Sequence, residues 1–191
     1  IAERIINEVA DYHFSQSGDL KEFLLTDQFL VNTYKARNTN LGYALHEINR
    51  QVSGGQHSNE LLNTELFYSI AESIVADQAI IYEQYSRLQF KKTETRQSLF
   101  RQLLEAREYM DAHLSDDIHL DQIIRNAFMS KYHFIRSFKA TFILSPYQYI
   151  LRKRLESARV QLLGGSNVTE TAFDAGYPDS SSFSKAFKAA S

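Results

Sequence analysis

One pattern of apolar and polar residues occurs twice in the second half of this chain. The first copy reads LDQIIRNAFMSKYHFIRSFK from Leu120 to Lys139, and the second reads VTETAFDAGYPDSSSFSKAFK from Val168 to Lys188. Each copy has a short apolar segment, a break, and a polar segment that contains F-x-x-x-F followed by Lys. The copies align at an offset of 48 residues before the break and 49 after it, so the extra residue falls in the turn. This agreement favours a repeated structural unit over two accidental pairs of core phenylalanines.

The second copy has the residue types of two short helices joined by a tight turn. Asn167 or Ser166 can cap the first helix, and Asp179 or Ser180 can cap the second. Gly176 lies at the break, where a positive φ is needed, and glycine adopts it without steric cost. The second helix has Phe183, Ala186 and Phe187 on one face and serines and lysines on the other. These features predict a helix-turn-helix at about 167–188 and, by alignment, another at about 118–140.

A single helix is expected between the two copies. Ser145 can cap it, Pro146 suits its first turn, and Gly164-Gly165 can end it, which predicts a connecting helix over about 146–163. Such a helix is roughly 27 Å long at ~1.5 Å per residue. It could hold two recognition helices about 34 Å apart, the length of one DNA turn. We therefore expect one chain to read two successive major-groove segments.

Helix signals dominate the rest of the chain, because it contains only 2 Pro and 7 Gly in 191 residues. Apolar residues at helical spacing predict further helices at about 1–14, 41–52, 59–90 and 95–114. The segment 20–31 is ambiguous between buried helix and strand. The fold class predicted is therefore all-α, with a helical N-terminal region followed by the two helix-turn-helix units.

The net charge of −2 conceals an asymmetry between the two halves. Residues 1–95 contain 8 Lys and Arg against 13 Asp and Glu, whereas residues 96–191 contain 13 against 10. From Ile118 onward basic residues outnumber acidic ones by 10 to 5. An acidic half joined to a basic half favours a polyanion as the partner of the half that holds the repeat.

Several classes of protein are disfavoured by what the sequence lacks. Without cysteine there are no disulfides, thiol nucleophiles or Cys-based zinc sites. No apolar segment approaches the ~18 residues of a membrane span, and no leader peptide is visible, so we expect a cytoplasmic protein without membrane partners. His46-Glu47 is not followed by the second His of a zincin helix, because Arg50 stands there. We expect no enzyme activity, metal or cofactor.

The stretch from Leu120 to Lys188 closely resembles the DNA-binding domain of AraC/XylS-type transcription regulators. The resemblance is carried by S-x-x-x-F-x-x-x-F-K at 130–139, S-P-x-x-Y at 145–149, RLESARVQLL at 154–163, and T-E-x-A-x-x-x-G-Y-x-D-x-x-x-F-S-K-x-F-K at 169–188. The chain departs from the family pattern at Ile124, Phe128 and Ile143, where the family favours Ala, Gly and Gly. The family also normally continues with a Gly-x-x-Pro segment beyond the point where this sequence ends.

The resemblance implies a sequence-specific, DNA-binding transcription regulator, most often an activator that contacts RNA polymerase. By motif position, the residues implied to contact bases are Tyr132, Ile135 and Arg136 in the first unit and Ser180, Ser181, Ser184 and Lys185 in the second. Lys131, Lys139 and Lys188 are implied to contact phosphates. Arg136 is the first candidate for specificity, because arginine is the usual partner of guanine in the major groove.

The resemblance also divides the chain into two regions. Residues 96–191 would be the DNA-binding domain, and residues 1–95 would be helices that dimerise or connect it to a sensor barrel absent from this sequence. A homodimer through the N-terminal helices and an unknown small-molecule effector are therefore expected partners besides double-stranded DNA and RNA polymerase. The alternative is a helical dimerisation, interaction or ligand-sensing fragment that does not bind DNA in this truncated form.

Overall fold

The computed structural model describes residues 8–9, 39–53, 64–89, 92–116, 118–125 and 129–190. Within these ranges the regular backbone is helical and contains no strand, which confirms the all-α fold class. None of the helices in this described part of the chain is long and apolar enough to cross a lipid bilayer. The chain divides into two compact units, an N-terminal unit (Ile1–Ser86) and a C-terminal unit (Arg87–Ser191).

The boundary between these units has a physical basis at its C-terminal side. Leu88 is buried, and the guanidinium of Arg87 donates a hydrogen bond of 3.1 Å to the carbonyl of Thr141. Thr141 lies near the end of a helix of the C-terminal unit, where orphan carbonyls favour a cation. These two contacts anchor the start of the C-terminal unit to its own core.

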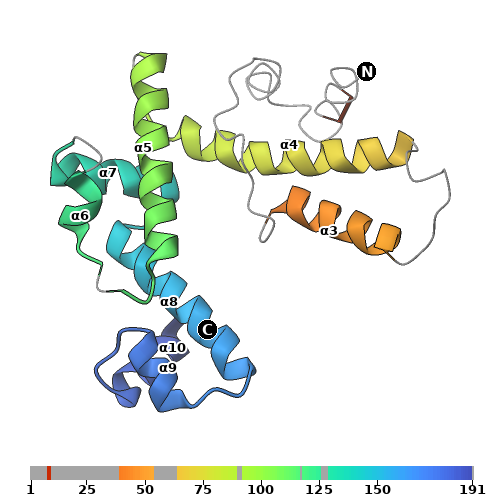
Figure 1. Ribbon diagram of the computed structural model, residues 1–191. Coiled ribbons are helices and arrows are strands. Elements are labelled where there is room, and N and C mark those ends of the chain that lie inside the picture. The colour runs from red at the N-terminus through yellow and green to blue at the C-terminus, as the bar shows by residue number, and fades with distance from the viewer. Residues whose placement is uncertain are drawn as a thin grey trace. The chain divides into compact units, whose positions relative to one another are not determined.

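In the N-terminal unit, α3 (Asn40–Ser53) and α4 (Thr64–Ser86) pack side by side (Figure 1). The buried carboxylate of Asp77 on α4 accepts hydrogen bonds from the backbone N–H groups of Asn40 and Leu41 at 2.9 and 3.0 Å. A third backbone N–H group at this helix start, that of Gly42, donates a hydrogen bond to the hydroxyl of Thr39. Because a helix N-terminus favours negative charge, α4 stabilises the start of α3 through Asp77.

The expectations for the first part of the chain fall largely outside the described residues. Of the helix expected at 1–14, only Glu8 and Val9 are described, and both are helical. The ambiguous segment 20–31 and the start of the helix expected at 59–90 lie outside the described ranges.

The C-terminal unit contains α5 (Thr93–Ala112), α6 (Leu120–Arg125), α7 (Lys131–Phe142), α8 (Pro146–Leu163), α9 (Val168–Asp174) and α10 (Ser180–Ala190). The first helix-turn-helix consists of α6 and α7, and the second consists of α9 and α10. The turn at 126–128 between α6 and α7 lies outside the described residues. Between the two, α8 contacts α5 and α7 as well as α9 and α10 (Figure 1).

The start of α8 is determined by a capping box. The hydroxyl of Ser145 accepts the N–H of Gln148, and the side chain of Gln148 accepts the N–H of Ser145 in return. Pro146 occupies the first turn, where its missing N–H costs nothing. The helix ends at Leu163 before Gly164 and Gly165, and the second glycine has a φ of 88°.

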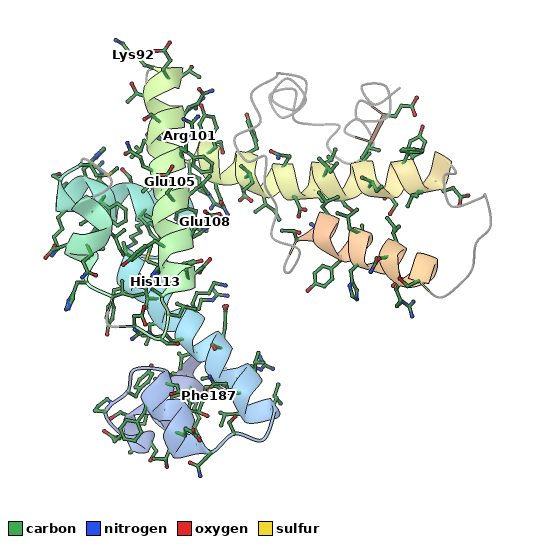
Figure 2. The ribbon with its side chains drawn as sticks, viewed as in Figure 1. Lys92, Arg101, Glu105, Glu108, His113 and Phe187 are labelled. Carbon is green, nitrogen blue, oxygen red and sulfur yellow. The ribbon has the colours of Figure 1, made fainter. Side chains whose placement is uncertain are left out.

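The core of the C-terminal unit begins on α5. Leu99, Leu103, Ala106 and Met110 are all buried, at the three- and four-residue spacing of one helix face. The opposite face of α5 is polar, with Arg101, Glu105 and Glu108 exposed along the helix (Figure 2). This amphipathic helix contacts α6, α7 and α8, so it forms the base on which the first helix-turn-helix packs.

The end of α7 carries backbone strain. Ile143, one of the positions where the family favours glycine, has a φ of 70° in the left-handed region and is 63% exposed. A β-branched residue is disfavoured in this conformation because its Cβ crowds the backbone. The left-handed helix end is therefore kept although the glycine that normally permits it is absent.

We predict that Ile143→Gly raises the free energy of unfolding by about 0.5–1 kcal/mol. Relief of left-handed strain gains about 1–2 kcal/mol, and the greater freedom of glycine in the unfolded chain cancels part of it. Urea unfolding followed by circular dichroism measures the change. Val160→Gly is the matched control, because Val160 is an exposed β-branched residue inside right-handed α8. The control is expected to lower the free energy of unfolding by about 0.5 kcal/mol. A similar loss for Ile143→Gly would show that Ile143 is not strained in the folded protein.

Candidate nucleic-acid interface

Helix α7 has one buried face and one exposed face. Phe134 and Phe138 are fully buried, with their ring centroids 5.7 Å apart, and the ring of Tyr149 from α8 meets Phe138 edge-on at 5.7 Å. The opposite face consists of Lys131, Tyr132, Arg136 and Lys139, which are exposed, and Ile135, which is half-buried. The ring of Tyr132 is 75% exposed. The two phenylalanines thus orient a cationic and aromatic face toward solvent.

An acidic side chain accompanies the first lysine of this face. The ammonium group of Lys131 donates to the carboxylate of Asp121 on α6 at 3.0 Å, and both side chains are exposed. An exposed pair of this kind contributes only ~0–1 kcal/mol, so a phosphate could replace the carboxylate at little cost. The pair was not foreseen from the sequence, because no local spacing rule joins residues ten apart across a turn.

Helix α10 is oriented in the same way by the core of the second helix-turn-helix. Phe183 is buried, and its ring centroid lies 5.5 Å from that of Tyr177 and 5.4 Å from that of Phe187. Phe187 is partly buried and packs against the core that α8, α9 and α10 form together (Figure 2). On the opposite face Ser181, Lys185 and Lys188 are exposed, and Ser180 and Ser184 are half-buried.

The start of α10 is capped by a carboxylate. Asp179 accepts the backbone N–H of Ser182 at 2.7 Å through one oxygen and the Ser182 hydroxyl at 2.9 Å through the other. These hydrogen bonds, the backbone one foremost, hold the pKa of Asp179 below its ordinary value. Asp179 therefore stabilises the helix in its charged form.

The two exposed faces differ in chemistry. Besides its lysines, the face of α7 offers arginine, tyrosine and isoleucine, whereas the face of α10 offers serines beside Lys185 and Lys188. The hydroxyl of Ser184 also donates to the carbonyl of Ser180 at 2.7 Å within the helix. Its proton is thus engaged, and the oxygen remains able to accept a hydrogen bond.

All ten residues predicted from the sequence to contact DNA lie on α7 or α10. Seven of them are exposed, Ile135, Ser180 and Ser184 are half-buried, and none belongs to the buried core. Their contacts with bases or phosphates remain predictions. In the described part of the chain, no group of three or more His, Asp and Glu side chains could hold a metal ion.

Comparison with known proteins identifies this region. Residues 123–191 match the family model described as a helix-turn-helix domain. The chain is 34% identical over 82 residues to the probable transcriptional regulator LumQ of Photobacterium leiognathi, covering 42% of this chain and 33% of that protein. It is 32% identical over 85 residues to the regulatory protein PocR of Salmonella typhimurium, covering 44% and 28%. No solved structure is significantly similar to the chain.

The matches confirm the resemblance expected from the motifs, over the C-terminal part of the chain. The aligned segment spans only about a third of the length of each relative. What is shared is the helix-turn-helix region described above.

We predict that the cap of α10 makes stability depend on pH through Asp179. Because the folded pKa is lowered, the charged cap contributes above the unfolded pKa of about 3.9, and the contribution is lost as pH falls through the folded value. Asp179→Asn keeps a capping side chain without the charge, whereas Asp179→Ala removes the cap. The unfolding temperature of wild type should exceed that of Asp179→Asn at pH 6, and the difference between the two should be smaller at pH 3. An equal difference in unfolding temperature at both pH values would show that the charge of Asp179 does not stabilise α10.

Proposed function

We propose that this chain, whose residues 123–191 form an AraC-type helix-turn-helix domain, is a sequence-specific DNA-binding transcription regulator. The observation that carries the proposal is the pair of helices α7 and α10. Each is capped at its start and presents basic and polar side chains to solvent; α7 is anchored by the buried Phe134 and Phe138, and α10 is anchored by the buried Phe183. Both pack on the same helix, α8. Two such helices on one support suit two successive major-groove segments.

The base contacts we propose follow from the donors and acceptors on each face. Arg136 can form a bidentate pair with O6 and N7 of guanine. Tyr132 and Ile135 can contact the methyl groups of thymine. Ser180, Ser181, Ser184 and Lys185 supply the contacts of the second segment, with less power to distinguish bases, because serine pairs with several of them.

The phosphate contacts we propose are those of Lys131, Lys139 and Lys188. A lysine ammonium is a compact charge without a fixed hydrogen-bonding plane, so it attracts phosphates without reading sequence. Release of condensed counterions should make the affinity fall steeply with salt concentration.

The wider role follows the family resemblance. We propose an activator that contacts RNA polymerase in the cytoplasm, has no enzyme activity and responds to an unknown small-molecule effector, with residues 1–95 as its linker and dimerisation region. A homodimer through the N-terminal helices is part of this proposal. The exposed side chains of Tyr43 and Leu45 on α3 and of Phe67 and Ile80 on α4 favour such an association. The same four residues support the second candidate function, a helical interaction module that does not bind DNA.

Selection of duplexes from a random DNA library at two salt concentrations tests the proposal. A bipartite motif with half-sites about one helical turn apart supports the regulator. Recovery of no motif by a folded protein, with dimerisation intact, would instead support the interaction module.

We predict that Arg136→Ala weakens binding to the selected site by about 5–150-fold and removes the preference at one base position. Lys139→Ala should instead weaken all sequences alike and reduce the slope of log K against log salt by about 1. Fluorescence anisotropy against the selected duplex and its single-base variants measures both effects. Arg159→Ala on α8 is the charge-matched control, because Arg159 is exposed but lies outside both proposed faces. An equal, sequence-independent loss for Arg136→Ala and Arg159→Ala would show that Arg136 reads no base.

A further inference from the structure

Arg154 lies in the middle of α8 and contacts parts of the chain that come both before and after it. Its Nε donates to the carbonyl of Leu114 at 2.7 Å, and its Nη2 donates to the carbonyl of Asp116 at 2.7 Å. These carbonyls belong to the segment that leaves α5 and leads to α6, the first helix of the first helix-turn-helix. Short hydrogen bonds from a charged guanidinium are stronger than neutral ones, and the planar fork holds both acceptors in a defined geometry.

The third nitrogen of the same guanidinium lies against the turn of the second helix-turn-helix. A Cβ built on Gly176 would come within 2.5 Å of Nη1 of Arg154. Gly176 also has a φ of 79°, between α9 and α10. Glycine at this position therefore serves two purposes: it permits the left-handed turn, and it leaves room for the guanidinium of Arg154.

Residues of α8 before Arg154 contact α5 and the first helix-turn-helix. Before it, the hydroxyl of Tyr149 donates to Asp111 of α5 at 2.8 Å, and its ring meets Phe138 of α7. Burial, together with the bond to Asp111, raises the pKa of Tyr149, so this hydroxyl remains a donor at neutral pH.

On both sides of Arg154, α8 packs on the second helix-turn-helix. Leu155 and Ala158 form a buried cluster with Ala172, Ala175 and Phe183, and Leu151 packs against this cluster. The guanidinium of Arg154 thus meets the backbone of the segment before α6 and the turn of the second unit at Gly176.

We infer that Arg154 is a positioning residue that sets the separation of the two recognition helices, and through it the half-site spacing that one chain accepts. This inference rests on the proposed DNA-binding function. Each helix-turn-helix retains its own buried phenylalanines without Arg154. The loss of Arg154 should therefore change how the two units are held together more than how either one folds.

The test uses the two half-sites obtained by selection, joined by spacers that vary by one base pair. Wild type should prefer one spacing by about tenfold over spacings one base pair longer or shorter. Arg154→Met keeps a long side chain but removes both hydrogen bonds, and its preference should fall to about threefold or less. Its affinity for the first half-site alone should stay within about twofold of wild type.

Arg152→Met is the matched control. Arg152 is an exposed arginine on the same helix, and it forms an ion pair with Glu156 of α8 itself. It should keep the wild-type spacing preference. Arg154→Lys retains the charge and can donate to one of the two carbonyls, so its spacing preference should lie between those of wild type and Arg154→Met. If Arg154→Met does not fold, the spacing preference of Arg154→Lys tests the inference instead.

Gly176→Ala gives a second probe, because the added Cβ displaces the guanidinium. The added Cβ also strains the left-handed turn, but it does so with and without Arg154, so the comparison of the two backgrounds isolates the contact with Arg154. Gly176→Ala should weaken the spacing preference in wild type and have little further effect on spacing in Arg154→Met. A wild-type spacing preference in folded Arg154→Met, or in Arg154→Lys and Gly176→Ala together, would overturn the inference while leaving the proposed function intact. Failure of wild type to bind any selected duplex would overturn the proposed function and this inference with it.

Discussion

The arrangement of the C-terminal unit depends on one constraint: both helix-turn-helix units pack on the same helix. α8 extends over Pro146–Leu163 and contacts α5 and α7 as well as α9 and α10. A helix of this length is roughly 27 Å long and behaves as a stiff rod. Two recognition helices mounted on it cannot vary their separation freely, which distinguishes this chain from two DNA-binding modules joined by a flexible linker.

Burial determines which side chains are left for recognition. In α7 and α10, phenylalanines spaced four residues apart lie on the core face, so the side chains between them point outward. The first of these outward faces carries Arg136 and Tyr132, and the second carries serines, one of which already donates to its own helix. The same core pattern thus supports two surfaces of unequal chemistry, and the first surface has the greater capacity to distinguish base pairs.

Features set by neighbouring residues were predictable from the sequence, and features set by distant residues were not. Ser145 with Pro146, Asn167 and Asp179 act as helix starts in the structure, because capping depends on residues two to three apart. By contrast, Asp77 at the start of α3 and Arg154 over Leu114 join residues 37 and 40 positions apart. No periodicity encodes such contacts. At Ile143 the sequence indicated a missing glycine, but only the backbone shows that the left-handed conformation is kept.

The central claim is that one chain carries two recognition helices at a set separation on one support. Hydroxyl-radical footprinting of a complex with one protein chain per selected duplex tests it most directly. The account predicts two protected segments on the same face of the DNA, centred about 10 base pairs apart. Protection of a single segment, or of two segments only when two chains are bound, would contradict it.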